Sequence, residues 1–176
     1  MTEQELIERL GFTPKYCSVG TLIAIAEYPE DKGFTGDRYF LSNFWDVKHT
    51  VNVAGGPCVF YSTECSFQTS KVENPTEARC FVNLTPRQGK IRGKQVKLRE
   101  GWDDIRDEIM YQVNMAKYTQ NPVLAEKLLA TGDDELVEFN TWNDKYWGVC
   151  RGEGENKLGK VLMRIRQEFK DKYINN

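Results

Sequence analysis

Residues 61–71 read YSTECSFQTSK, and in this stretch the pattern of the sequence changes from strand to helix. Two segments with the pattern of strands precede it, one on either side of a pair of glycines. Apolar residues after it recur at spacings of three and four. Ser62 or Thr63 can cap a helix, and an acid at Glu64 suits the positive end of the helix dipole. The stretch therefore predicts a helix that directly follows a hairpin.

Three polar side chains of this stretch, Glu64, Gln68 and Lys71, are spaced by four and three residues. On a helix with about 100° per residue they lie on one stripe, and Phe67 points away from it. One interpretation is a solvated helix face, which the pattern alone favours. The other is a carboxylate and an ammonium in a cleft, a pairing suited to proton transfer and to developing positive charge.

The remaining patterns predict an α+β fold, a mainly α-helical single domain with a small antiparallel sheet. The hairpin is predicted from alternating residues over 46–53, a turn at Gly55-Gly56 and a return strand at 58–61. A strand is also expected at 21–28. Helices are predicted at 3–10, from residue 62 onward, and at 75–83, 103–118, 122–131 and 157–173.

Composition restricts the class of protein. The chain has 176 residues, a net charge of −2 and a pI of about 5.6, which argues against a surface made wholly for nucleic acid. The first residues lack the pattern of a signal peptide, and no run approaches the roughly 18 apolar residues of a membrane span. Five scattered cysteines without a CxxC pair indicate reduced thiols in the cytoplasm. With a single histidine, His49, we expect no metal site and no cofactor.

A basic run covers residues 87–99, which contain six lysines and arginines and no acid. It is either an exposed helix face or a grip for phosphate, in which case Arg92 and Arg99 are the candidate ligands. Trp102 follows at the start of the next helix. It can anchor the core or provide a surface on which a base stacks.

Two further stretches combine polar residues with aromatic or glycine residues. WNDKYWG at 142–148 places aromatic residues around Asp144, and packing and binding explain it equally well. GEGENKLG at 152–159 contains Asn156 and Gly159 before the last helix, where free amides can receive an anion. By contrast, His49 alternates with valines and is interpreted as a strand residue, and Cys65 as a buried neutral thiol.

Six motifs in order resemble the NADAR family, the YbiA-like N-glycosidases, over about residues 34–170. The matching segments are FxGxxYFLSNF (34–44), TExxFQxxK (63–71), LREGWDDIRDEIM (98–110), NPxLxxxLLxTGDxxLVE (121–138), NDxYWG (143–148) and GxNxLGxxLMxIR (154–166). Residues 1–20 are accordingly expected to be an N-terminal extension, and residues 21–176 a YbiA-like N-glycosidase domain.

The resemblance implies an enzyme that hydrolyses an N-glycosidic bond to a ribose phosphate or ADP-ribose moiety. The substrate is then either a phosphoribosylamino-pyrimidine intermediate of riboflavin synthesis or ADP-ribosyl-guanine in nucleic acid. Glu64 is expected to stabilise the oxocarbenium ion, Asp144 to hold or protonate the leaving base, and Lys71 either to hold charge or to form a Schiff base. The substrate-binding residues expected are Asn43, Phe44, Gln68, Arg92, Arg99, Trp102, Trp147, Asn156 and Gly159.

Two other functions are compatible with the sequence. A non-catalytic module that binds ADP-ribose or a related nucleotide would bind without bond cleavage, although the set Glu64, Lys71 and Asp144 argues against it. A helical scaffold would leave WNDKYWG unexplained. The partners expected are a nucleotide-like or ADP-ribosylated substrate, with nucleic acid only as a carrier of that modification, and no membrane.

Overall fold

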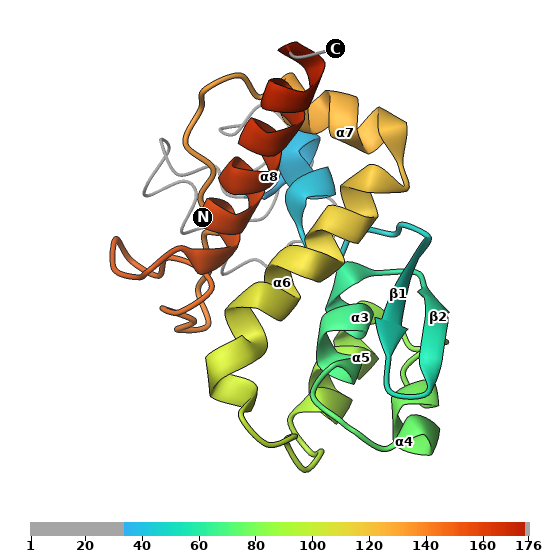
Figure 1. The fold of residues 1–176 in the computed structure, drawn as a ribbon. Coiled ribbons are helices and arrows are strands. Elements are labelled where there is room, and N and C mark those ends of the chain that lie inside the picture. The colour runs from blue at the N-terminus through green and yellow to red at the C-terminus, as the bar shows by residue number, and fades with distance from the viewer. Residues whose placement is uncertain (1–33, 175–176) are drawn as a thin grey trace. The chain divides into compact units, whose positions relative to one another are not determined.

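The computed structural model describes residues 34–174, which form helices and one two-stranded antiparallel sheet (Figure 1). This confirms the predicted fold class. The described residues fall into two compact units, one formed by 34–42 and 133–164 and the other by 43–132 and 165–174. Each unit is described by itself below. The predicted helix 3–10, the strand 21–28 and the extension 1–20 lie outside the described residues.

The hairpin of the second unit consists of β1 (His49–Val53) and β2 (Gly56–Phe60). The pairing runs from His49 opposite Phe60 to Val53 opposite Gly56, so the turn is Ala54-Gly55 and not Gly55-Gly56 as predicted. Gly55 adopts a φ of 86°, a conformation that other residues rarely adopt. The predicted strand 46–53 begins three residues late, because only a single bond, from the N–H of Val47 to the carbonyl of Tyr61, extends the ladder beyond His49.

Helix α3 (Thr63–Thr69) begins directly after the hairpin, as predicted, with the side chain of Ser62 accepting a hydrogen bond from the N–H of Cys65. All seven of its residues are buried, and Glu64 and Gln68 are only 7% and 6% exposed. The interpretation of this stretch as a solvated face is therefore wrong. The helix also ends before Lys71, which lies in the following turn and donates its N–H to the carbonyl of Gln68.

Two short helices follow α3. Helix α4 (Pro75–Arg79) is shorter than the predicted 75–83, because its last carbonyls are taken up by turns that follow Arg79. Helix α5 (Pro86–Gly93) begins with a capping box between Thr85 and Gln88. It packs against α3 through Gly89 and Gly93, and a Cβ at these positions would lie 2.7 Å from Cys65 Sγ and 1.9 Å from Gln68 Oε1. Because Gly89 and Gly93 have no side chains, α5 can approach α3 closely enough to bury it.

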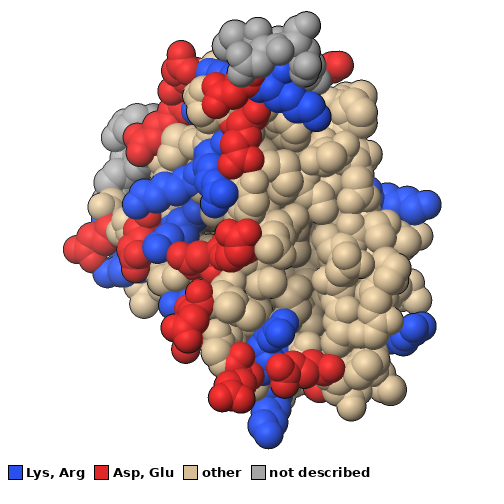
Figure 2. Space-filling model, viewed as in Figure 1, with Lys and Arg blue, Asp and Glu red and all other residues tan. Residues whose placement is uncertain are grey.

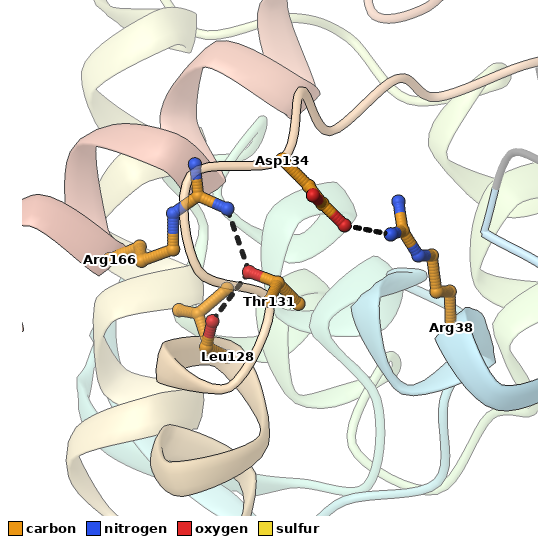
Figure 3. Close-up of polar contacts among 5 residues, drawn as sticks. All are labelled: Arg38, Leu128, Thr131, Asp134 and Arg166. Atoms are coloured by element: carbon orange, nitrogen blue, oxygen red, sulfur yellow. Dashed lines mark hydrogen bonds and ion pairs between the residues drawn. The ribbon is translucent and has the colours of Figure 1, made fainter.

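The long helix α6 (Trp102–Thr119) packs against both α3 and β1, and α7 (Pro122–Leu129) follows it. Helix α7 ends two residues before the predicted Thr131. The reason is that the Thr131 hydroxyl donates back to the carbonyl of Leu128 at 2.6 Å and accepts from Arg166 Nη1 at 2.7 Å (Figure 3). Arg166 belongs to α8 (Lys157–Ile174), which was predicted at 157–173.

The first unit contains the 3₁₀ helix η1 (Gly36–Leu41), the segment 133–156 and the first residues of α8. An ion pair between Arg38 and Asp134 ties η1 to this segment (Figure 3). A bridge between Phe139 and Val149 brings the two sides of the segment together. None of the helices in the described part of the chain is long and apolar enough to cross a bilayer.

Candidate active site

A buried carboxylate lies at the centre of the candidate site in the second unit. The N–H of Glu64 donates to the carbonyl of Asn43 at 2.9 Å, so the segment before the hairpin fixes the start of α3. One turn later, Nε2 of Gln68 donates to Oε1 of Glu64 at 2.8 Å. A charged acceptor makes this a strong hydrogen bond, and it orients the carboxylate within a buried helix.

Gln68 itself is positioned by the close approach of α5. Its Oε1 is buried without a hydrogen-bond partner in the described part of the chain and lies against Gly93, where no side chain intervenes. The amide therefore lies between Gly93 and Glu64, with its oxygen against the glycine and its nitrogen donating to the carboxylate. This places Gly93 among the residues that shape the site, although no motif of the sequence singled it out.

We expect Gly93→Ala to lower turnover roughly tenfold and the free energy of unfolding by about 1–3 kcal/mol. The added Cβ would require Gln68 to move and would break its hydrogen bond to Glu64. The matched control is Gly89→Ala on the same helix, whose Cβ meets Cys65 and not the Gln68–Glu64 pair. Steady-state kinetics and chemical unfolding of both variants test this. Equal losses of turnover at equal destabilisation would contradict a positioning role for Gly93.

Lys71, which lies in the turn after α3, is the third residue of the group with Glu64 and Gln68. Its Nζ donates to the carbonyl of Gly93 at 3.2 Å and lies 5.9 Å from the centroid of the Trp102 ring. Burial lowers the pKa of this amine from its usual 10.5, and the positive charges of Lys90 and Lys94 lower it further, while the charge of Glu64 acts in the opposite direction. The structure thus brings Glu64, Gln68 and Lys71 together, as the sequence predicted, and gives the amine an enhanced neutral fraction.

Trp102 anchors the core, the first of the two roles that the sequence left open for it, and its predicted role in base stacking stays a prediction. It is 6% exposed, and its ring packs on Phe67 with centroids 5.3 Å apart, so it anchors α6 to α3. The same ring lies beside the Lys71 ammonium. Because Arg99 donates its N–H to the carbonyl of Lys71 at 2.7 Å, the chain segment before Trp102 also fixes the lysine backbone.

Two buried asparagines hold the backbone next to Glu64, and only one of them, Asn43, was predicted from the sequence. Asn43, a predicted substrate-binding residue, accepts a hydrogen bond at Oδ1 from Nδ2 of Asn114 at 3.2 Å and donates to Met110 Sδ. Asn114 is fully buried on α6, and its signal in the sequence was a polar residue next to the apolar position of Val113. The pair holds the backbone of residue 43 where it receives the N–H of Glu64.

His49 and Cys65, both set aside as non-catalytic, are buried on the inner side of α3. Burial lowers the pKa of His49, so the ring is neutral, and its Nε2 shares a hydrogen bond of 2.9 Å with the hydroxyl of Ser66. Burial likewise raises the pKa of the Cys65 thiol, which donates to the carbonyl of Leu84. Both residues therefore link α3 to its neighbours and are not available as nucleophiles.

The two arginines predicted to bind phosphate each have a contact elsewhere in the second unit. The Arg92 guanidinium lies over the ring of Phe81, 5.5 Å from its centroid. Arg99 pairs at 4.0 Å with Glu73 and faces a separate open cavity of about 390 Å³, lined by Asn52, Val53, Ala54, Ser70, Val72, Glu73, Arg99 and Ile109. Substrate binding by these arginines stays a prediction.

Asp144 and Trp147 belong to the first unit. Oδ1 of Asp144 accepts the N–H groups of Tyr146 and Trp147 at 3.2 and 2.9 Å, and Asn140 bonds the backbone of Asp144 on both sides. The rings of Tyr146 and Trp147 meet edge to face, with centroids 5.0 Å apart. The WNDKYWG stretch is therefore a tight turn organised by its own carboxylate, with both aromatic rings partly exposed.

Asn156 and Gly159, also in the first unit, support the segment that precedes this turn. The Asn156 amide accepts from the N–H of Glu138 and donates to the carbonyl of Leu136. A Cβ at Gly159 would lie 1.9 Å from that same carbonyl. Their predicted role in substrate binding stays a prediction, but both have a clear role in packing the segment against the start of α8.

Residues 32–170 match the family model of the NADAR domain. The chain therefore belongs to the NADAR family, and the resemblance drawn from its motifs is confirmed. The chain is similar to the riboflavin biosynthesis protein VVA0006 of Vibrio vulnificus, with 35% identity over 136 residues that cover 75% of this chain and 36% of that protein. It is also similar to the N-glycosidase YbiA of Escherichia coli, with 40% identity over 87 residues that cover 49% of this chain and 52% of that protein.

A solved structure supports the same relationship. The NMR structure of E. coli YbiA superimposes with a TM-score of 0.71 at 28% sequence identity, covering 80% of this chain and 83% of the other. The sequence alignments span about half or less of the length of the curated relatives. Their names state an N-glycosidase activity and a place in riboflavin biosynthesis for those proteins.

Proposed function

We propose that this protein is an N-glycosidase that hydrolyses the bond between a nitrogenous base and a phosphorylated ribose. The observation that carries the proposal is the buried carboxylate of Glu64, oriented by Gln68 and accompanied by the Lys71 amine. The membership of the NADAR family and the similarity to E. coli YbiA support the same class of reaction.

The chemistry of the bond explains why a carboxylate and an amine are suitable. As the bond between the base nitrogen and C1 of ribose breaks, positive charge grows on C1 and the ring oxygen, and negative charge grows on the base. A buried carboxylate facing the sugar stabilises the first charge more strongly than an exposed one would, because less water screens it. We assign this role to Glu64.

We assign Lys71 a covalent role. Its neutral amine attacks C1 as the base leaves, and the leaving nitrogen takes up a proton. Opening of the C1–O ring bond then gives a Schiff base between C1 and Nζ, and water hydrolyses it to release the sugar and restore the lysine. The lowered pKa of Lys71 supports this role, because only the unprotonated amine is a nucleophile.

The roles expected of Asp144 and Trp147, protonation and enclosure of the leaving base, stay predictions from the sequence. The two backbone N–H groups held by Oδ1 of Asp144 fix the direction of the carboxyl group. The partly exposed Trp147 ring offers a face on which a base can stack, a contact worth about 1–3 kcal/mol.

For the substrate we favour a small phosphoribosylamino-pyrimidine. The name of the Vibrio relative refers to riboflavin biosynthesis, and the net charge of −2 does not favour binding to a nucleic acid. In Figure 2 the visible face over the hairpin is largely uncharged, with isolated Lys or Arg side chains at its edge. The second candidate is ADP-ribosyl-guanine in an oligonucleotide, favoured by the acid-free run 87–99.

Product release from the two substrates tests the proposal. We expect the purified full chain to release ribose 5-phosphate from the pyrimidine substrate faster than it releases ADP-ribose from a guanine-modified oligonucleotide, as measured by chromatography of the products. The reverse preference would move the function to the second candidate. Tight binding of either compound without cleavage would instead identify a binding module and refute the enzyme.

A further inference from the structure

A fully buried asparagine, Asn114, lies on the buried face of helix α6, which packs against α3 (Figure 1). Asparagine is a poor helix former, and a buried amide lowers stability unless its polar atoms are hydrogen-bonded. In Asn114 the Oδ1 atom has no hydrogen-bond partner in the part of the chain that the structure describes. A leucine would avoid both costs, so the reason for an asparagine must lie in what its amide nitrogen does.

The amide nitrogen of Asn114 makes one hydrogen bond to a residue outside its own helix. Nδ2 contacts the carbonyl oxygen and Sδ of Met110, one turn earlier, at 3.1 and 3.5 Å, and it donates to Oδ1 of Asn43 at 3.2 Å. Asn43 lies in the turn before β1, outside any helix or strand. Its Nδ2 donates in turn to Met110 Sδ at 3.2 Å, so both polar ends of the Asn43 side chain bind α6.

The carbonyl of Asn43 extends these hydrogen bonds to α3. The first N–H groups of a helix have no acceptor within the helix. At the start of α3 the Ser62 side chain accepts the N–H of Cys65, and the Asn43 carbonyl accepts the N–H of Glu64 at 2.9 Å. The position of the Glu64 backbone decides where its carboxylate can reach, and Gln68 then orients that carboxylate.

We propose that Asn114 is a positioning residue, which acts through Asn43 to hold the carboxylate of Glu64 where the reaction requires it. The inference rests on the proposed function and adds to it a residue that does not touch the substrate. It also assigns Asn43 a different role, because a side chain with both polar ends bound to α6 supports Glu64 and does not contact the sugar. The unpaired Oδ1 of Asn114 is then a loss of stability that is retained for activity.

Variants that remove the donor at position 114 separate turnover from stability. We expect Asn114→Leu and Asn114→Ala to lower kcat roughly tenfold and to leave KM nearly unchanged, because a misplaced catalytic group slows the chemical step. In Asn114→Leu the denaturation midpoint should not fall. This variant removes one unpaired oxygen at position 114 and leaves one at Asn43, while leucine favours the helix and buries more apolar surface. Asn114→Ala should unfold more easily and still lose the same turnover.

The matched control is Tyr118→Phe, one turn further along α6. The Tyr118 side chain is also fully buried, and its hydroxyl also lacks a hydrogen-bond partner among the described residues. Removing this hydroxyl should keep or raise the denaturation midpoint and should leave kcat unchanged. Wild-type kcat in Asn114→Leu, or an equal loss of kcat in Tyr118→Phe, would overturn the proposal.

Hydrogen exchange measured by NMR tests the positioning without any substrate. The Glu64 amide should exchange roughly tenfold faster in Asn114→Leu than in the wild type or in Tyr118→Phe, because its acceptor is no longer held. The Cys65 amide, whose acceptor is the side-chain cap of α3, should keep its rate. Equal acceleration of both amides would show that α3 loosens as a whole, and no acceleration would show that Asn114 does not fix Glu64. Either result would overturn the inference.

The two measurements also separate this inference from the proposed enzyme. If the wild-type chain cleaves neither the pyrimidine substrate nor the modified oligonucleotide, the proposed function fails, and the exchange rates alone decide whether Asn114 holds the backbone of Glu64. If the wild type cleaves one of them and Asn114→Leu retains both its turnover and its slow exchange at Glu64, the positioning role fails alone.

Discussion

Replacing Glu64 by glutamine is expected to lower turnover by roughly 10³-fold while the protein remains folded. The variant removes the negative charge that we propose stabilises the developing oxocarbenium ion, and it changes the size of the side chain very little. The oxygen of the new amide can still accept the hydrogen bond from Nε2 of Gln68, so the free energy of unfolding should change by about 1 kcal/mol or less. Single-turnover kinetics and chemical unfolding measure the two quantities.

The control for this prediction is Glu100→Gln, which neutralises an exposed acid and should leave turnover unchanged. Glu64→Gln should also lower the pKa of Lys71 further, because the charge of Glu64 is what raises it. Any residual activity of the variant should therefore extend to lower pH than that of the wild type. Near-normal turnover in Glu64→Gln would show that this carboxylate is not the group that faces the sugar.

How far the sequence predicted this molecule depends on whether a feature is local. The capping of α3 by Ser62 and the alternation of β1 are local, and both are confirmed. The burial of Glu64 is not local, because it requires Gly89 and Gly93, more than twenty residues away, to bring α5 onto α3. Read alone, the polar stripe therefore favoured the wrong interpretation.

The same distinction applies to the basic residues. In the sequence, the arginines of the run 87–99 are the better phosphate ligands because of their planar guanidinium groups. In the structure, the Arg92 guanidinium lies over the ring of Phe81, while the charges of Lys90 and Lys94 lower the pKa of Lys71. Helix ends such as that of α7 were misplaced for a similar reason, since the side chain of Arg166 fixes Thr131 from a distant part of the chain.

Replacing Lys71 by arginine is expected to abolish covalent trapping and to lower turnover by roughly 10³-fold, although the positive charge remains. In the wild type, borohydride added during turnover should reduce the Schiff base to a stable secondary amine. Mass spectrometry should then find the phosphorylated sugar attached to the peptide that contains residue 71. The guanidinium of the variant stays protonated and cannot attack C1, so no adduct should form.

The pH dependence of adduct formation is an independent test of the covalent role of Lys71. The amine must be neutral to attack, so the rate of adduct formation should rise with pH. The midpoint of this rise should lie below the usual lysine pKa of 10.5, because burial and the charges of Lys90 and Lys94 lower the pKa of Lys71. In K90Q/K94Q the midpoint should move upward, since two of the charges that lower the pKa are gone. If Lys71 only holds charge, Lys71→Arg should retain most of the turnover and borohydride should trap nothing in either protein. That result would leave Glu64 as the stabilising group and would require water to attack C1 directly.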